Sequence, residues 1–428
     1  MNYGLIGEHL SHSFSKEIHE MCADYTYELC ELPPEAVADF MQNPAFKAIN
    51  VTIPYKQTVM PFLHEIHEHA RMIGAVNTVV NRDGKLYGYN TDFYGLSALV
   101  RRVCGCLRGK KVLILGSGGT SHTACAVAAS QHAAQVLTVV RTPKGDAQIS
   151  YAEAEEKHMD AEVIINCTPC GMYPYADGAE HIKGTPIDIT RFPRLAGVVD
   201  AVYNPLRTNL VQDALDRGIP AEGGLYMLVA QAVMACRIFL GHVEEAFSDE
   251  TAMDRETERV FKKILSDKEN IVLIGMPSSG KTTVGKALAE MLGRPFIDTD
   301  AVIVERAGKP ITDIFSELGE AGFRDLETQA VRDMANTHTG AIIATGGGAI
   351  LRDENVRALK RTGRLYFLNR PLEQLIPTAD RPIASTVEAI KRRFEERYDR
   401  YLSTCDKEIK NNETVDYTVN TIREDFFA

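Results

Sequence analysis

The 428-residue sequence has no tryptophan, no excess of positive charge and no apolar run of about 18 residues. The missing apolar run argues against a membrane-spanning helix, and the opening MNYGLIGEHL lacks the pattern of a signal peptide. A net charge of -11 argues against a nucleic-acid partner, because such proteins concentrate Lys and Arg in a basic footprint. The absence of tryptophan excludes nothing. We expect a cytosolic protein that binds small anions at local positive sites.

Disulfide bonds are also not expected, because nine cysteines scattered over this length form no disulfide framework. Cys167 and Cys170 form a C-x-x-C, but no second pair or histidine follows at ligand spacing, so we interpret the pair as coincidence. His64, His67 and His69 do not match H-E-x-x-H and are interpreted as a solvated helix face.

The order of apolar runs and helical patterns predicts an α/β protein with three folding units. Residues 1–100 alternate short strands and helices, and helices at about 225–245 are expected to complete this unit. Residues 101–224 have the spacing of a doubly wound parallel sheet. Residues 246–269 are densely charged, as in a helical or mobile linker, and 270–428 form a second α/β unit.

A glycine-rich turn follows the predicted strand KKVLIL and precedes an alanine-rich helix. Backbone N–H groups at such a helix start bind a pyrophosphate, so the turn predicts a dinucleotide site, although a glycine turn that serves packing alone stays open. The next strand ends in VVRTPK, where basic residues replace the usual ribose-binding acid and favour NADP over NAD; an ordinary basic surface turn is the alternative. The expected cofactor-binding residues are Gly116, Ser117, Gly118, Gly119, Thr120, Arg141, Thr142 and Lys144.

A second glycine loop, GMPSSGKT, fits G-x-x-x-x-G-K-[ST] between a strand and a helix. Its amides are expected to bind nucleotide phosphates, with Lys281 at the terminal phosphates and the Thr282 hydroxyl on Mg²⁺. The loop does not separate a kinase from a GTPase or a motor ATPase, but no N-K-x-D guanine signature appears. The predicted nucleotide-binding residues are Gly275, Gly280, Lys281, Thr282 and Thr283.

Seven ordered motifs resemble shikimate dehydrogenase over about residues 1–240: LIGEHLSHSFSKEIHE, INVTIPYKQ, GAVNT, GYNTDFYG, INCTPCGM, DAVYNPLRT and GGLYMLVAQA. The resemblance implies a substrate domain, a Rossmann-type NADP domain and reduction of 3-dehydroshikimate to shikimate with NADPH. It implies that Ser13 and Ser15 bind the substrate carboxylate and that Ala201 and Gly224 lie near the nicotinamide. The other implied substrate-binding residues are Thr52, Asn77, Tyr203 and Gln231.

Lys56 and Asp92 are the predicted catalytic pair of this half. An ammonium beside a ring ketone can stabilise and then protonate the developing alkoxide, and a neighbouring carboxylate can orient it. A simple ion pair is the alternative. The sequence departs from the family pattern at Lys16, where proline is usual, and at Val140, where asparagine is usual. The second departure removes one expected contact to the adenosine ribose.

The stretches RPFIDTDAVIVERAGKPITDIFSELGEAGFRDLE and ATGGGAI resemble shikimate kinase, with residues 270–428 as its P-loop domain. The resemblance implies Asp298 near Mg²⁺, Asp300 at the acceptor hydroxyl and Arg381 as the lid arginine on the transferring phosphoryl group. Arg324 and Arg397 would bind the substrate carboxylate, with Gly347 and Gly348 close to the ring. The lid PLEQLIPTADRPIAS is poor in arginine, and no second arginine to flank adenine is evident.

The two glycine loops therefore predict two successive reactions on one acid, with shikimate as the product of the first and the substrate of the second. Two alternatives stay open. One is a quinate or shikimate dehydrogenase fused to a kinase for another small hydroxy acid, and the other is a nucleotide-sensing regulator with an inactive kinase half.

Overall fold

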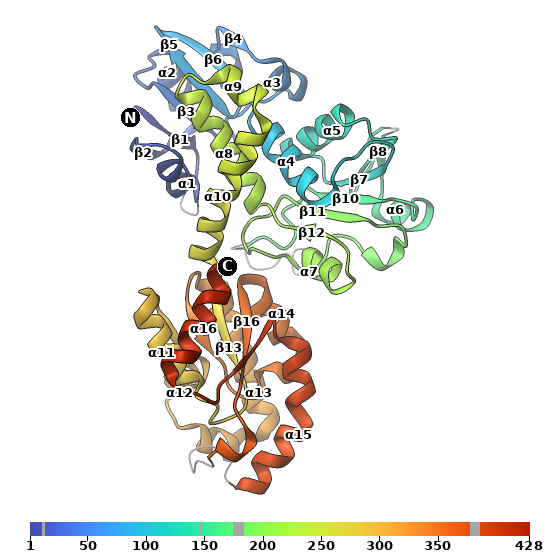
Figure 1. The fold of residues 1–428 in the computed structure, drawn as a ribbon. Helices are drawn as coiled ribbons and strands as arrows, with labels where there is room; N and C mark the ends of the chain where they lie inside the picture. Colours follow the sequence, from blue (N-terminus) through green and yellow to red (C-terminus); the bar gives the residue numbers. More distant parts are fainter. Residues whose placement is uncertain (11–12, 146, 174–183, 377–385) are drawn as a thin grey trace. The chain divides into compact units, whose positions relative to one another are not determined.

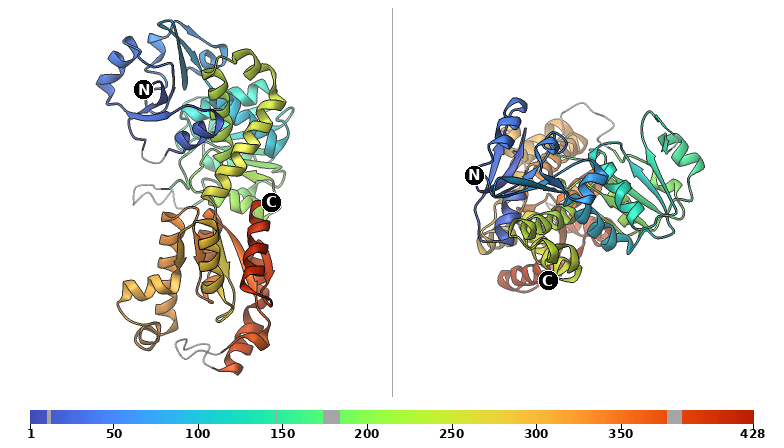
Figure 2. Two further views of the ribbon diagram at one scale, coloured as in Figure 1. Left: turned by 60° about the vertical axis from the view of Figure 1, so that its left-hand side comes forward. Right: turned by 90° about the horizontal axis from the view of Figure 1, so that it is seen from above.

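The computed structural model describes residues 1–10, 13–145, 147–173, 184–376 and 386–428. The chain divides into two compact units, Met1–Ile264 and Leu265–Ala428 (Figures 1 and 2). Among the described residues, no helix is both long enough and apolar enough to span a membrane.

The first sheet of the amino-terminal unit mixes parallel and antiparallel strands in the order β2-β1-β3-β5-β6-β4. β1 pairs in parallel with β2 and β3, whereas β5 runs antiparallel to β3 and β6. β3 is buried along its whole length, as its apolar sequence AINV predicts. The strands are β1 (Tyr3–Gly7), β2 (Tyr27–Glu31), β3 (Ala48–Val51), β4 (Glu65–Ile66), β5 (Thr78–Arg82) and β6 (Lys85–Tyr89).

The second sheet of this unit is parallel throughout, in the order β12-β11-β10-β7-β8-β9. This is the doubly wound arrangement that the strand and helix spacing predicts, with strand order reversing at β7. The strands are β7 (Lys111–Leu115), β8 (Gln135–Val139), β9 (Gln148–Ile149), β10 (Val163–Asn166), β11 (Gly197–Asp200) and β12 (Ala221–Glu222).

Two helices connect the sheets. α4 (Asp92–Cys104) and α8 (Leu225–Phe239) pack along each other; α8 also contacts β3 and β5, and α4 also contacts β11. Burial on several sides explains why α8 is apolar almost all round. The other helices before residue 249 are α1 (Ser15–Cys22), α2 (Val37–Gln42), α3 (Glu68–Ile73), α5 (Gly119–Ser130), α6 (Tyr151–Lys157), α7 (Asn209–Asp216) and α9 (Val243–Ser248).

The charged segment after α9 forms the helix α10 (Glu250–Lys268), which is packed against the amino-terminal unit. Met253, Val260, Phe261 and Ile264 are buried on one of its faces. Its acidic residues pair with arginines of α4: Asp254 with Arg101 at 2.9 Å, and Glu258 with Arg102 at 2.7 Å. The thin apolar periodicity of this segment is thus enough to dock a helix.

The carboxy-terminal unit has a parallel sheet in the order β14-β15-β13-β16-β17 with helices around it. Its longest helix, α13 (Ile311–Thr337), is kinked at Gly319, whose φ of 68° is a conformation that favours glycine. The strands are β13 (Asn270–Ile274), β14 (Phe296–Asp298), β15 (Ile342–Ala344), β16 (Gly363–Asn369) and β17 (Lys407–Lys410). The other helices are α11 (Lys281–Leu292), α12 (Thr299–Ala307), α14 (Asp353–Thr362), α15 (Val387–Thr404) and α16 (Val415–Phe427).

Candidate active sites

A cavity of about 340 Å³ lies in the amino-terminal unit and collects residues from segments far apart in the sequence. Such a volume suits a small molecule. All eight residues predicted to bind or transform the substrate in this half line it: Ser13, Ser15, Thr52, Lys56, Asn77, Asp92, Tyr203 and Gln231.

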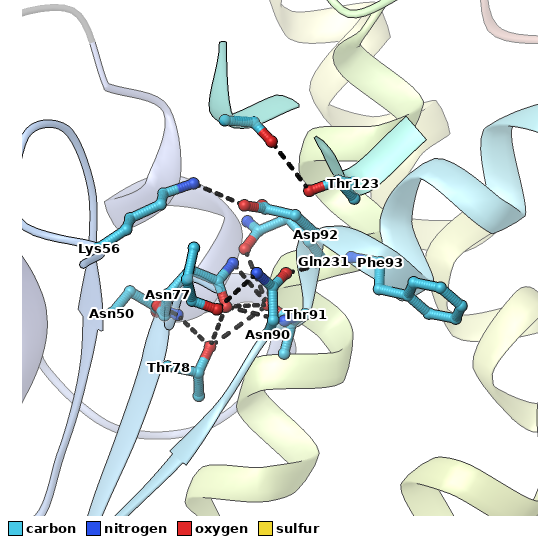
Figure 3. Close-up of polar contacts among 12 residues, drawn as sticks. Asn50, Lys56, Asn77, Thr78, Asn90, Thr91, Asp92, Phe93, Thr123 and Gln231 are labelled. Carbon is cyan, nitrogen blue, oxygen red and sulfur yellow. Dashed lines mark hydrogen bonds and ion pairs between the residues drawn. The ribbon is translucent and has the colours of Figure 1, made fainter. Parts of the chain in front are cut away.

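Lys56 and Asp92 form an ion pair in this cavity, with Lys56 Nζ 2.5 Å from Asp92 Oδ2 (Figure 3). Lys56 stands in the turn after β3, and Asp92 is the first residue of α4. The ammonium retains 28 % and the carboxylate 17 % of its exposure. Both groups therefore face the cavity and can still reach a ligand.

A buried hydrogen-bond network holds the cavity floor beside this pair (Figure 3). Asn77 Oδ1 accepts from the Thr91 backbone N–H at 2.8 Å, and Thr91 Oγ1 donates to Gln231 Oε1 at 3.3 Å. Asn50 Nδ2 donates to Thr78 Oγ1 at 3.0 Å. Because Thr91 immediately precedes Asp92, the network fixes the start of α4 and with it the carboxylate.

The first glycine loop joins β7 to α5, as predicted. Gly116 has a φ of 104°, and a side chain there would contact Thr168 and Cys167 of the loop after β10. Space around the α carbons of Gly118 and Gly119 is open, so a ligand can approach the backbone closely. The turn therefore has the backbone path and the room that a pyrophosphate needs.

The three basic-turn residues predicted to select NADP, Arg141, Thr142 and Lys144, are exposed just after β8. β8 pairs in parallel with β7, so the turn lies at the same carboxyl edge of the sheet as the glycine loop.

Asp200, at the end of β11, is fully buried and organises the loops beside this edge. Its carboxylate accepts from Asn166 Nδ2 at 2.9 Å, the Val202 N–H at 3.0 Å and Thr208 Oγ1 at 2.6 Å. Burial raises its pKa to about 6, although these hydrogen bonds oppose the shift. Tyr203 follows on the same loop.

Ala201 and Gly224 are in direct contact, because a side chain at Gly224 would overlap the Ala201 carbonyl. The Gly224 N–H donates to the Val202 carbonyl at 2.8 Å. Glycine is therefore required for this close approach, which places the two residues predicted to lie near the nicotinamide side by side.

The second glycine loop connects β13 to α11. Lys281 Nζ donates to the Gly275 and Met276 carbonyls at 2.8 Å each. Gly280 has a φ of 91° and precedes the first residue of the helix. The ammonium is thus held over the loop, where the phosphates of a nucleotide would lie.

The Thr282 hydroxyl donates to Asp298 Oδ2 at 2.8 Å. Asp298 caps α12, because its other carboxylate oxygen accepts from the Asp300 N–H at 3.0 Å. A hydroxyl and a carboxylate are oxygen ligands of the kind that Mg²⁺ prefers, so this pair fits a magnesium ion next to the loop.

A second, tight cavity of about 40 Å³ lies in the carboxy-terminal unit and contains Asp300 with two buried arginines. Arg324 Nη1 donates to Glu327 Oε2 at 2.7 Å, and Arg397 Nη1 donates to the Gly347 carbonyl at 3.1 Å. Within the described residues, Arg324 Nε and Arg397 Nη2 are buried without a partner. Two unsatisfied guanidinium N–H groups in one cavity fit an anionic ligand.

Three consecutive glycines form one wall of this cavity. A side chain at Gly346 would lie 2.6 Å from both Asp300 Oδ1 and Glu327 Oε1, and one at Gly348 would overlap the Arg324 guanidinium. The glycines therefore allow the charged groups to converge. Arg381, the predicted lid arginine, lies outside the described residues.

Comparisons with known proteins identify both halves. A family model of the shikimate dehydrogenase substrate binding domain matches residues 5–79, and one of shikimate kinase matches residues 277–426. A shikimate dehydrogenase (NADP(+)) of Clostridium perfringens is 35% identical over 256 residues, which cover 56% of this chain and 92% of that protein. The chain belongs to the shikimate dehydrogenase family.

Solved structures agree with this assignment for the dehydrogenase unit. A chorismate mutase/shikimate 5-dehydrogenase fusion protein of Clostridium acetobutylicum is 34% identical with a TM-score of 0.53, covering 62% of this chain and 98% of that one. Shikimate dehydrogenase 1 of Peptoclostridium difficile is 29% identical with a TM-score of 0.51, covering 61% and 98%. With the kinase domain matched behind it, one chain carries an oxidoreductase and a kinase, as the sequence predicts.

The sequence interpretation of this dehydrogenase–kinase chain missed two residues. Glu327 is fully buried against Arg324, and burial raises its pKa while Arg324 opposes the shift. Arg324 and Glu327 are three residues apart on a predicted helix, and this spacing indicates an ion pair. It does not separate a buried pair from a surface pair. Asn50 lies in INVTI, a pattern that predicts only a strand.

The interpretation of the histidines as one solvated helix face is wrong. His64 precedes β4, and His67 is the N-cap of α3, so the three residues do not share a helix. His67 stacks on Phe247 at 4.4 Å between ring centres, and His69 stacks on Phe93 at 4.3 Å.

Proposed function

We propose that this chain reduces 3-dehydroshikimate to shikimate with NADPH and then phosphorylates shikimate to shikimate 3-phosphate with ATP. The observation that carries the proposal is the convergence of all eight predicted dehydrogenase residues on one cavity, with the Lys56–Asp92 pair inside it. Family membership supports the first reaction, and the kinase match supports the second.

In the dehydrogenase reaction, Lys56 donates a hydrogen bond to the C3 oxygen of the ring and supplies the proton that converts the alkoxide to a hydroxyl. Asp92 holds the ammonium in place at 2.5 Å and accepts from the same hydroxyl. Ser13 and Ser15, which line the same cavity, bind the carboxylate, and Asn77 and Gln231, fixed by their network, orient the ring hydroxyls.

NADPH would supply the hydride when bound, and the open glycines of the β7–α5 turn fit its pyrophosphate. The exposed guanidinium of Arg141 and ammonium of Lys144 attract the 2′-phosphate. Gly224 and Ala201, which pack directly on each other, are the residues expected to lie near the nicotinamide.

In the kinase reaction, the unsatisfied N–H groups of Arg324 and Arg397 bind the substrate carboxylate. Asp300 accepts the proton of the attacking hydroxyl or orients it, and Lys281 and Arg381 neutralise charge on the transferring phosphoryl group. Thr282 and Asp298 would hold Mg²⁺, which would neutralise negative charge on the nucleotide phosphates.

The first experiment tests the reductase. The wild-type chain should oxidise shikimate with NADP, and Lys56→Ala should lower kcat by about 100-fold or more with NADP affinity nearly unchanged, because general acid–base groups contribute about 10²–10⁴-fold. Quinate and NAD serve as comparison substrates. A K56A chain that retains most of its turnover would contradict the role of Lys56, and faster turnover of quinate than of shikimate would contradict the substrate.

The second experiment tests the kinase. ADP production by the wild-type chain should depend on added shikimate, and Asp300→Asn should lower kcat while ADP still binds. Shikimate-independent ADP production, or none with any hydroxy acid, would contradict the proposed second reaction without affecting the first.

A further inference from the structure

Arg370 is a cation beside the second glycine loop for which the described residues supply no counterion. It follows β16 directly, and its Nε is buried without a hydrogen-bond partner among the described residues. The neighbouring carboxylate of Glu408 accepts instead from Asn369 at 2.6 Å. A partly buried guanidinium without an anion is unfavourable, so an anionic ligand is the expected partner.

The position of Arg370 is set by the sheet. β16 pairs in parallel with β13, the strand that enters the glycine loop, so both strands end at the same edge. A side chain built on Gly280 would lie 3.7 Å from Arg370 Nη1 and 3.2 Å from Asn411 Nδ2. Asn411 Nδ2 in turn donates to the Ser279 carbonyl at 2.6 Å. The guanidinium therefore borders the space directly over the loop.

Gly280 leaves that space open. The same loop contains Lys281, whose ammonium is held by the Gly275 and Met276 carbonyls. Two cations thus approach the loop from different elements, Lys281 from α11 and Arg370 from the end of β16. A guanidinium is suited to phosphate oxygens because it donates two parallel hydrogen bonds.

We propose that Arg370 binds the α- or β-phosphate of the adenine nucleotide in the kinase site, an inference that rests on the proposed kinase function. Its guanidinium places a positive charge next to the nucleotide phosphates from the edge of the sheet. The lid sequence of this domain is poor in arginine and has few such charges of its own. Arg370 touches the nucleotide and not the acid, so it should change nucleotide affinity and leave shikimate binding unchanged.

The test is the affinity of the full chain for ADP, measured by isothermal titration, for R370Q, R370K and R361Q. Arg361 is a matched control, because it lies just before the opposite end of β16 and its Nε is also buried without a partner among the described residues. Its environment is positive, with Arg332 and Arg357 nearby. R370Q should bind ADP at least about ten-fold more weakly, in line with hydrogen bonds to charged groups. R370K should stay within about five-fold of wild type, and R361Q should match wild type.

Adenosine, measured by its competition with ADP, separates the phosphates from the base. Its affinity should be the same in wild type and R370Q; an equal loss for adenosine and ADP would show that Arg370 contacts the base and would overturn the proposal. Unchanged ADP affinity in R370Q, or equal affinities of R370K and R370Q, would overturn it too. If R370Q does not fold, R370M removes the same charge and is measured in its place: R370M that binds ADP as tightly as R361Q would overturn the proposal.

Different results would contradict the proposed kinase function and the proposed role of Arg370. A wild-type chain that binds ADP through Arg370 but transfers no phosphate to shikimate would leave the inference standing. A wild-type chain that makes shikimate 3-phosphate while R370Q binds ADP normally would overturn the inference alone.

Discussion

Glu327 positions a neighbouring arginine in the kinase cavity, although its own carboxylate does not bind the anionic substrate. Its buried carboxylate is 2.7 Å from Arg324 and holds that guanidinium at the glycine wall. Burial opposes the charge of Arg324, but Glu327 and Glu320 outweigh this effect and raise its pKa. The carboxylate therefore keeps Arg324 both charged and oriented for the substrate.

Glu327→Gln should raise the KM for shikimate about ten-fold or more and change kcat less, because a charge-assisted hydrogen bond contributes about 1.5–3 kcal/mol to orienting Arg324. Steady-state kinetics at saturating ATP measure both constants. The control is Glu320→Gln, since Glu320 is about half exposed and pairs with Arg324 at 3.3 Å. Equal changes of KM in the two variants would contradict a special role for the buried carboxylate.

His19 should make the dehydrogenase unit sensitive to acid. Burial lowers its pKa from 6.5 to about 3, against a hydrogen bond with Asn50 that raises it. Below about pH 6.5 the unfolded chain therefore binds a proton at His19 that the folded chain does not bind. The free energy of unfolding falls as the pH drops from about 6.5 towards 3. The loss should be roughly 2 kcal/mol between pH 7 and pH 5.

Urea unfolding of wild type and His19→Phe at both pH values measures this contribution, which the variant should lack.

Asp200 should change the free energy of unfolding in the opposite direction. Its folded pKa of about 6 lies above its unfolded value of 3.8, so its contribution to stability is lost as pH rises from about 4 to 6. Asp200→Asn should therefore lose more stability than wild type on acidification. Identical pH dependence in all three proteins would contradict both assignments.

The sequence predicts residues well where a motif specifies both the residue and its neighbours. Lys56, Asp92 and Lys281 lie where NVTIPYK, NTD and the glycine loop place them. Glu327 and Arg370 could not be predicted in this way, because their roles depend on burial and on the edge to which a parallel strand brings them. Neither property is visible in local spacing.

At the scale of elements, the least predictable segment is α10. Its composition predicts a helical or mobile linker, but Phe261 is buried with its ring 5.1 Å from that of Tyr226. Arg102 lies over both rings and pairs with Glu258 and Glu222. Four buried apolar residues and a set of ion pairs therefore hold α10 in place, although its average hydrophobicity is low. The central strands, by contrast, follow from their apolar runs, whereas β17, with the sequence KEIK, has no such run.

Phe261→Ala should lower the unfolding free energy of the dehydrogenase unit by about 3–5 kcal/mol, the range for a buried aromatic residue. Differential scanning calorimetry of the full chain, with NADP added to mark the dehydrogenase transition, measures the loss. Lys262→Ala changes an exposed neighbour on the same helix and should stay within about 0.5 kcal/mol of wild type. Similar effects of both variants would mean that α10 does not pack as described.

At the scale of the whole molecule, each unit has its own candidate substrate cavity. Ser13 and Ser15 belong to one, and Arg324 and Arg397 belong to the other. Two complete sets of carboxylate-binding residues are what independent capture from solution requires. We therefore expect shikimate to be released between the two reactions.

The fused chain and a mixture of separate halves should show the same lag before shikimate 3-phosphate appears. The halves are separated at the boundary of the two units, as residues 1–264 and 265–428, because Ile264 is buried in the first unit while the Lys268 carbonyl accepts from the Gly340 N–H in the second. Stopped assays at equal concentrations measure the lag. A markedly shorter lag for the fused chain, with unchanged steady-state rates of both halves, would contradict free release.

The packing of α10 also limits how this joining segment can change in length during evolution. Met253, Thr257, Val260, Phe261 and Ile264 are buried at the three-, four- and seven-residue intervals of one helix face. Deleting one residue between Met253 and Val260 turns everything after it by about 100° and exposes the aromatic ring that Arg102 covers. Natural relatives with the same docked helix should therefore gain or lose three, four or seven residues here, and single-residue insertions should be found only after Ile264.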